Sequence, residues 1–277
     1  MIEPLKYLEA ISVIEEVKTD GHSPLIDVGS DYCEYFVKNT RGRNPDFSII
    51  NEFLCHYLLR LWDIPTPEIA AVRLLPEKLP GNLSQWHKRH FYETITFGSK
   101  RIDYSVELNN FIDVHGKLAL KRLINPEVIV KLGLFDIWVE NTDRKPTNTN
   151  ILLVSTNENF EVYAIDNAFT FDSLNYKNLF LGITNTYDQS ILNTDFAKSV
   201  ILNCSKQEDW YESLREYFYF CIESSQHSFS EIVDNLPEEL RFSLDLQQEI
   251  QDFLFNEERN KQVFDEFLTR LSHESIF

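Results

Sequence analysis

Residues 143–166, DRKPTNTN-ILLVS-TNENF-EVYAID, decide how this chain is interpreted. A polar loop, 143–150, precedes two apolar runs, 151–155 and 161–166, which are separated by an asparagine-containing turn. Two such runs, rich in apolar and β-branched residues, predict a β-hairpin. Before the loop, segment 126–141 has apolar residues at helical spacing and begins with proline, which is favoured in the first turn of a helix. The predicted order is therefore helix, polar loop, hairpin.

Three polar side chains of this stretch stand in an order that suits phosphoryl transfer. Asp143 and Asn148 lie five residues apart in the loop, and Asp166 ends the hairpin. Phosphoryl transfer needs a carboxylate to orient the attacking hydroxyl. It also needs an amide oxygen and a second carboxylate to hold Mg²⁺ against the nucleotide phosphates. In protein kinases these groups follow the same order and spacing. The spacing alone is weak, because Asp and Asn are abundant in any polar turn.

The first third of the chain offers residues for the rest of such a site. Lys38 ends the predicted strand YFVK, and Glu52 lies in a predicted helix, 47–62, that Asp46 can cap. A kinase uses a strand lysine to bind phosphates and a helix glutamate to hold that lysine. The ordinary alternatives are a solvated lysine and a glutamate on the helix surface. The turn TDGHS, 19–23, stands where a phosphate-covering loop belongs, but one glycine makes a weak motif.

The remaining patterns predict an α+β chain with a mixed first third and a mostly helical remainder. Residues 68–75 predict a strand, whereas 80–100 show no regular pattern. Beyond about residue 205, the runs 210–225 and 244–271 alternate acidic and apolar faces, as helices packed on a core do. No change of composition marks a domain boundary, so a division near residue 100 is approximate.

Composition excludes several classes of protein. Hydrophobic residues make up 43% of the chain, which excludes a disordered protein, and no apolar run is long enough to cross a bilayer. The start, MIEPLKYLEA, is unlike a signal peptide, so we expect a cytoplasmic protein without membrane contact. A net charge of −18 disfavours direct nucleic-acid binding. Two basic clusters, at 38–43 and 78–90, are expected to be solvated. The four cysteines lack zinc-site spacing, and no G-x-S-x-G, HExxH or GxxxxGK(S/T) motif occurs.

Six segments occur in the order found in one known family. They are TDGHS (19–23), YFVKN (35–39), the stretch 50–74 that begins INEFL, FGSKRI (97–102), LFDIWVENTDRKPTNTNILL (134–153) and YAIDNAFTF (163–171). On these segments the chain resembles the HipA-like kinase domains, a bacterial family related to the HipA toxin Ser/Thr kinases. Beyond residue 175 the likeness is limited to helical character.

The resemblance implies an α+β, two-lobed protein-kinase-like fold, with a β-rich N-lobe at 1–100 and a mostly helical C-lobe that carries the catalytic loop at 101–277. It also implies an ATP- and Mg²⁺-dependent kinase whose expected substrate is protein Ser/Thr. The implied residues are catalytic Asp143, Lys38 and Glu52, nucleotide-binding Thr19, Gly21, Ser23, Lys38, Asn148 and Asn150, and the metal ligands Asn148 and Asp166.

Other outcomes stay open at the level of sequence. Lys145 stands where many relatives have histidine, and Asp166 is followed by Asn167 and Ala168 rather than by glycine. The alternatives are a weak or non-catalytic binding module with a kinase fold, and a small-molecule phosphotransferase. An operon-encoded antitoxin-like partner is a further expectation from the resemblance. Toxicity is not carried over, because the chain starts almost at the nucleotide loop.

Overall fold

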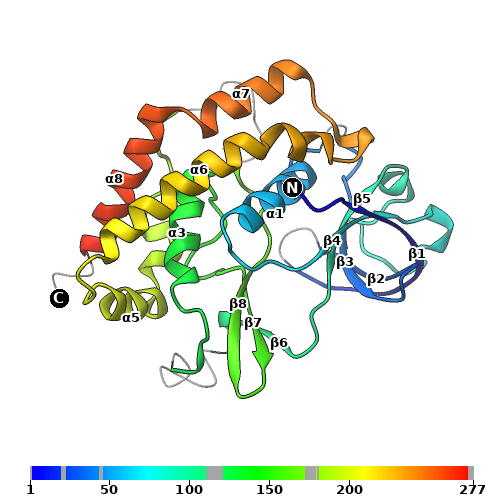
Figure 1. The fold of residues 1–277 in the computed structure, drawn as a ribbon. Coiled ribbons are helices and arrows are strands. Elements are labelled where there is room, and N and C mark those ends of the chain that lie inside the picture. The colour runs from blue at the N-terminus through cyan, green and yellow to red at the C-terminus, as the bar shows by residue number, and fades with distance from the viewer. Residues whose placement is uncertain are drawn as a thin grey trace.

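The structure is a computed structural model that describes residues 2–19, 23–43, 46–109, 111, 121–171, 179 and 181–273. The first part of the chain is rich in β-strands and the last part is helical, as Figure 1 shows. The predicted α+β class is therefore confirmed. Within the described residues, no helix is both long and apolar enough to span a membrane.

Five strands close into a small barrel in the N-terminal part of the fold. Their order around the barrel is β1 (Lys6–Glu16), β2 (Leu25–Gly29), β3 (Glu34–Lys38), β5 (Thr96–Lys100) and β4 (Ile69–Arg73). Neighbours are antiparallel, except that β1 and β4 run parallel. Side chains alternate between the faces of a strand, so one face of each strand fills the interior. The buried interior includes Leu25, Tyr35, Val37, Ala70 and Val72.

Strand β5 corrects the prediction that residues 80–100 are irregular. Its middle residue is Gly98, which weakens the alternating pattern by which a strand is detected. The barrel nevertheless requires glycine here, because a Cβ atom at Gly98 would lie 2.6 Å from Cγ2 of Val72. Glycine thus permits the close approach of a neighbouring strand.

Three connections leave the barrel from the same end. Leu25 pairs with Val37, and Lys38 pairs with Phe97, so the end of β3 lies beside the starts of β2 and β5. The end of β4 pairs with the start of β5 in the same way. We call this the Lys38 end of the barrel. The connections that leave it are 17–24, 39–46 and 74–95.

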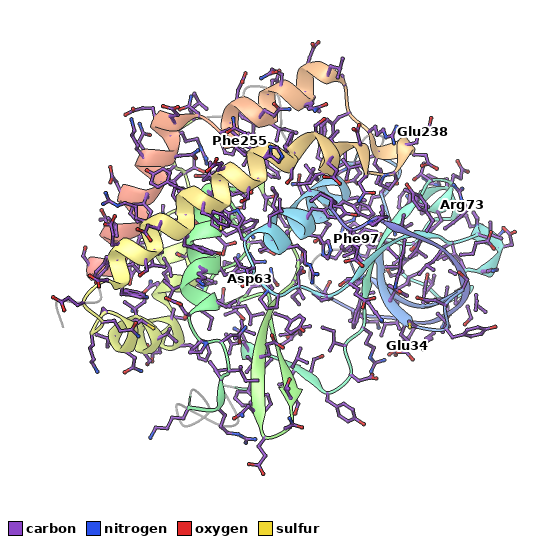
Figure 2. The ribbon with its side chains drawn as sticks, in the orientation of Figure 1. Glu34, Asp63, Arg73, Phe97, Glu238 and Phe255 are labelled. Atoms are coloured by element: carbon purple, nitrogen blue, oxygen red, sulfur yellow. The ribbon has the colours of Figure 1, made fainter. Side chains whose placement is uncertain are left out.

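Helix α1 (Phe47–Leu61) follows the Lys38 end, as predicted. Asp46 caps the helix, because its Oδ1 accepts a hydrogen bond from Ser48 N at 2.9 Å. Eleven of its fifteen residues are buried, so the helix packs against neighbours on more than one side. On the barrel side, Phe53 meets Phe97 edge-on with ring centroids 5.0 Å apart; Figure 2 labels Phe97.

The predicted hairpin is confirmed by β7 (Ile151–Thr156) and β8 (Asn159–Ala164), which pair antiparallel along their whole length. A third strand, β6 (Ser105–Glu107), pairs with β7 and was not predicted. Helix α3 (Val128–Trp138) precedes the polar loop and begins two residues after Pro126. Ten of the eleven residues of α3 are buried, which explains why it shows no polar face.

In the described C-terminal part, four longer helices follow: α5 (Asp195–Cys204), α6 (Trp210–Asp234), α7 (Leu244–Leu254) and α8 (Glu257–His273). The helical character predicted for 244–271 is confirmed, and the structure divides this stretch into two helices. The chain breaks between α7 and α8, where Asn256 Oδ1 accepts a hydrogen bond from Arg259 N at 2.9 Å and starts a new helix. Trp62 Nε1 donates to Ser225 Oγ at 3.2 Å, which ties the end of α1 to α6.

Candidate active site

Lys38, Glu52 and Asp166 form a charged cluster where the barrel, α1 and the hairpin meet, with Lys38 and Glu52 buried and Asp166 partly exposed. Lys38 ends β3, and its Nζ lies 2.5 Å from Oε1 of Glu52 and 2.9 Å from Oδ1 of Asp166. Lys38 is 9% exposed and Glu52 is 2% exposed. The ordinary alternatives, a solvated strand-end lysine and a surface glutamate, are therefore wrong for this chain.

The two carboxylates of the cluster stabilise the charged form of Lys38. Burial lowers the pKa of Lys38, but the carboxylates of Asp166 and Glu52 outweigh burial and hold that pKa above its ordinary value. Burial raises the pKa of Glu52, and the Lys38 ammonium opposes this rise. The ammonium consequently stays charged at neutral pH and gives the cluster a fixed positive charge.

Asp166 occupies a strained backbone position that its neighbours hold. Its φ of 55° lies in the left-handed region, which costs a non-glycine residue roughly 1–2 kcal/mol. The next amide, Asn167 N, donates to Oε2 of Glu52 at 2.9 Å. Asn51 Nδ2, also on α1, donates to Ala168 O at 2.9 Å. Helix α1 therefore fixes the segment that carries Asp166.

The polar loop gathers the other predicted residues around Asp143. Its Oδ2 accepts hydrogen bonds from Asn148 Nδ2 at 3.1 Å and from Asn150 Nδ2 at 3.3 Å. Asn141 Oδ1 accepts a hydrogen bond from Asp143 N at 3.1 Å and so fixes the backbone. Lys145 Nζ lies 3.9 Å from the other carboxylate oxygen of Asp143. The carboxylate is thus oriented by two amide donors and flanked by a half-exposed cation.

Arg144 joins the two clusters, and sequence reasoning gave it no role of its own. Its side chain is fully buried and forms an ion pair with Asp136 of α3. Its Nη2 donates to Ile165 O at 2.8 Å and to Asn167 Oδ1 at 2.9 Å. The loop with Asp143 and the residues on both sides of Asp166 therefore share one network. Asp136, a lone acid in an apolar helix, was the signal for a buried cationic partner.

The predicted nucleotide loop is described at its two ends. Ser23 N donates to Thr19 Oγ1 at 3.0 Å, and Ser23 Oγ donates to Thr19 O at 3.2 Å. These bonds close the turn at the Lys38 end of the barrel, between β1 and β2. Gly21, which was also expected to contact nucleotide, lies outside the described residues.

The donors in the two clusters fit a magnesium–nucleotide complex better than a free metal ion. Among the described residues, no group of three or more His, Cys, Asp or Glu side chains is arranged to hold a metal. Mg²⁺ bound with nucleotide commonly takes only one or two protein oxygens, and phosphates and waters complete its shell. Asp166 supplies a carboxylate that is one-third exposed. Asn148 turns its Nδ2 toward Asp143, so the Oδ1 of the same planar amide is not used in that hydrogen bond and can serve as a ligand.

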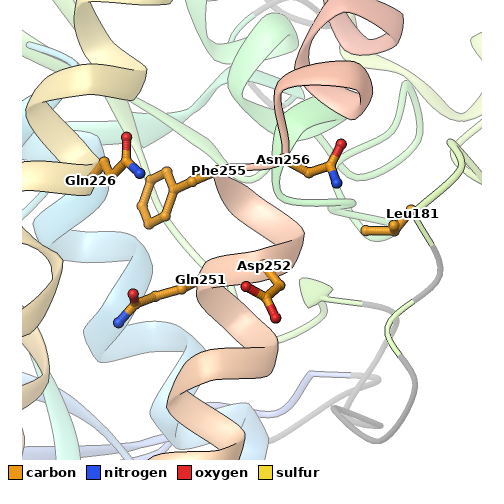
Figure 3. Close-up of a pocket in the computed structure, with 6 residues that line it drawn as sticks. All are labelled: Leu181, Gln226, Gln251, Asp252, Phe255 and Asn256. Carbon is orange, nitrogen blue, oxygen red and sulfur yellow. The ribbon is translucent and has the colours of Figure 1, made fainter.

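A hollow between α6 and α7 is a separate feature, shown in Figure 3. None of the predicted site residues lines it. Among the described residues its lining contains no cationic side chain, so it lacks the groups that a nucleotide triphosphate requires. The residues that line it are Leu181, Gln226, Gln251, Asp252, Phe255 and Asn256.

Comparison with known proteins identifies a similar solved structure and a matching family. No curated protein matches this chain. A crystal structure of a Helicobacter pylori proinflammatory kinase, CtkA, is similar at 12% sequence identity and a TM-score of 0.46, covering 99% of this chain and 100% of that one. A likeness at this level is too distant to support an inference. A family described as HipA-like kinase matches residues 10–271, which include most of the barrel, α1, the Asp143 loop and nearly all of the C-terminal helices. This chain therefore belongs to the HipA-like kinase family, as its sequence resemblance indicated.

Proposed function

We propose that this chain is an ATP- and Mg²⁺-dependent kinase that phosphorylates a Ser or Thr hydroxyl of a protein. Membership of the HipA-like kinase family supports a kinase-type phosphotransfer function. The observation that carries the finer proposal is the Lys38 cluster, with Nζ 2.5 Å from Glu52 and 2.9 Å from Asp166. A strand lysine held by a helix glutamate is the arrangement by which kinases bind nucleotide phosphates.

The proposed division of the chain follows the same logic. Residues 1–100, with the barrel and α1, would form the lobe that binds nucleotide, and residues 101–277 would form the lobe that carries the catalytic loop. The nucleotide would then lie between Lys38 on the first lobe and Asp143 on the second. The hydrogen bonds of Arg144 connect the loop to the residues beside Asp166 and would hold Asp143 and Asp166 at a fixed separation.

Asp143 would act as the residue that orients the substrate hydroxyl and accepts its proton. Two amide donors, from Asn148 and Asn150, already hold one of its carboxylate oxygens. A carboxylate fixed in this way loses little freedom when it receives a hydroxyl hydrogen bond. Asp166 and the amide oxygen of Asn148 would hold Mg²⁺, which when bound neutralises charge on the β- and γ-phosphates. Lys38 would contact the phosphates, and Glu52 would position Lys38.

The test is incubation of the purified protein with Mg²⁺ and γ-labelled ATP, alone and with cell lysate, beside Asp143→Asn. Loss of a proton-accepting group costs about 10²- to 10⁴-fold in rate, so the variant should retain almost no transfer. Asp265→Asn, at an exposed position on α8, is the matched control and should transfer phosphate normally. Both variants should unfold at the temperature of the wild type.

Each outcome of this experiment separates the proposal from its alternatives. Label on lysate proteins that disappears in Asp143→Asn supports a protein kinase. Label that appears only on metabolites supports a small-molecule phosphotransferase. A folded wild-type protein that consumes no ATP with any acceptor would refute catalysis and favour a binding module. An antitoxin-like partner stays a prediction, which co-purification from the native host would test.

A further inference from the structure

A group of basic side chains lies on two of the connections that leave the Lys38 end of the barrel. We call it the basic patch, and its members are Arg41, Arg43, Lys88, Arg89 and His90. The last four are exposed, and Arg41 is half-buried. The expectation that residues 78–90 are solvated is therefore right for these side chains, but it is wrong for His87, which is buried.

The two connections that carry the patch are packed against each other. A Cβ atom on Gly42 would lie 3.0 Å from the ring of Phe91. The guanidinium carbon of Arg41 lies 4.8 Å from the ring centroid of Trp86, and Lys88 Nζ lies 5.8 Å from that of Phe91. These distances place the cations on both connections in one continuous surface rather than on two separate loops.

A buried polar network supports the patch from below. Asn39 Nδ2 donates to Tyr92 Oη at 2.9 Å and to Trp86 O at 3.2 Å. Tyr92 Oη lies 2.5 Å from His87 Nδ1, and His87 Nε2 lies 3.2 Å from a carboxylate oxygen of Glu16 on β1. Because hydrogen bonds between buried polar groups rigidify their surroundings, this network restricts the movement of the two connections that carry the patch.

The patch is positively charged, whereas the protein as a whole is acidic. The whole chain has a net charge of −18, yet segments 39–46 and 79–93 contain only two acids, Asp46 and Glu93. Asp46 is already used to cap α1. In the described part of the structure, none of the four exposed patch residues forms an ion pair with a carboxylate. The positive field of the patch is therefore only weakly compensated.

The patch also borders the proposed phosphotransfer site. It stands at the same end of the barrel as Lys38 and Ser23, and the backbone of Ser23 lies close enough to His87, beneath the patch, to raise the pKa of that imidazole against the effect of burial. Arg43 follows Lys38 by five positions in the chain, which limits the distance between their Cα atoms to about 18 Å. An extended peptide of about five residues covers that distance.

We propose that the basic patch binds an acidic segment of the protein substrate, close in sequence to the hydroxyl that is phosphorylated. This inference rests on the proposed kinase function and adds a substrate class to it. A short acidic peptide fits better than a nucleic acid, because the three exposed cations Arg43, Lys88 and Arg89 suffice for a few carboxylates. The surrounding acidic surface would repel a long phosphate backbone.

The experiment measures peptide binding by fluorescence anisotropy in the absence of ATP. The probes are short labelled peptides with one serine flanked by glutamates, and control peptides in which glutamine replaces each glutamate. The patch variant combines Arg43→Gln, Lys88→Gln and Arg89→Gln. The matched control combines Lys206→Gln, Arg215→Gln and Lys261→Gln, which removes the same charge from exposed positions of the helical part.

We expect the wild type to prefer the glutamate peptide, and the patch variant to bind it about tenfold more weakly, since each exposed ion pair contributes little. The preference should fall as salt rises, because ions screen exposed charges. The control variant should bind like the wild type, and because no ATP is present, binding is judged independently of catalysis. Equal loss in the patch and control variants would overturn the proposal, because it would reflect net charge alone. Tighter binding of a single-stranded oligonucleotide that the patch variant loses would overturn it in favour of nucleic acid.

Discussion

Replacing Lys38 with methionine should reveal how strongly the buried cluster depends on charge balance. Methionine keeps an apolar stem but removes the ammonium that lies 2.5 Å from Glu52 and 2.9 Å from Asp166. Glu52 is 2% exposed, so it is left as a buried carboxylate beside another negative charge. Breaking one side of a buried ion pair costs about 3–5 kcal/mol. Asp166 is one-third exposed and partly screened by water, so we expect a value near the lower end, about 3 kcal/mol.

The double variant Lys38→Met/Glu52→Gln separates stability from function. Glutamine keeps an oxygen that can accept the hydrogen bond from Asn167 N, and no carboxylate is left fully buried. It should recover all but about 1 kcal/mol of the free energy of unfolding, yet gain no thermal stabilisation from Mg²⁺-ATP. The matched control is Lys100→Met, because Lys100 pairs with Glu68 at 3.1 Å on the exposed surface. Lys100→Met should lower the free energy of unfolding by less than about 1 kcal/mol.

Urea unfolding followed by tryptophan fluorescence measures all three variants, and pH supplies an independent check. Without Lys38, the pKa of Glu52 rises further, so the folded protein binds a proton that the unfolded chain has released. The loss of stability of Lys38→Met relative to the wild type should therefore grow as pH rises from 5 to 8. The reasoning fails if Lys38→Met stays within about 1 kcal/mol of the wild type at pH 8. It also fails if the double variant is no more stable than the single one.

Three further predictions concern other parts of the structure. Asp27, buried in the barrel without a hydrogen-bond partner among the described residues, has its pKa raised by burial to about 7. Between pH 4 and 7 the wild type should lose stability relative to Asp27→Asn by up to about 1.4 kcal/mol per pH unit, measured by urea unfolding. In Arg144→Lys, the lysine cannot bond Asp136 and the residues beside Asp166 at the same time. The variant should lose about 2 kcal/mol in free energy of unfolding, and its kcat in the labelled-ATP assay should fall about tenfold. Gly98→Val would press on Val72 and should lower stability by about 1–3 kcal/mol in thermal unfolding.

The parts of the fold that could be predicted are those with local causes. The hairpin at 151–164 follows from two apolar runs and a short turn, and the start of α1 follows from the capping residue Asp46. The grouping of Asp143 with Asn148 is also local, because both lie on one short loop. Spacing and turn chemistry carry enough information for such features.

The parts that could not be predicted depend on partners distant in sequence. β5 forms because Gly98 fits against Val72, and neither residue signals this alone. The burial of Lys38 and Glu52 could be suspected but not decided, since it requires the barrel, α1 and Asp166 to meet. The basic patch likewise exists only because two connections leave the barrel from one end. Such features depend on the register between strands and on the closure of the barrel, and no single segment of the sequence determines either.

The distribution of backbone strain explains why the helical part is needed for the site. Glu140, Asn150 and Asp166 all have positive φ, which is costly for residues other than glycine. The carboxylate of Glu140 accepts a hydrogen bond from Asn185 N at 3.1 Å, and Asn185 is in turn held by Arg270 of α8. Asn185 Nδ2 also donates to the backbone of the residue that positions Asp143. The strained loop is therefore held from its far side by the last helix, while α1 holds Asp166 from the near side. Such strained positions persist only where the surrounding structure over-determines them, so the proposed catalytic geometry is a property of the whole described fold rather than of the loop alone.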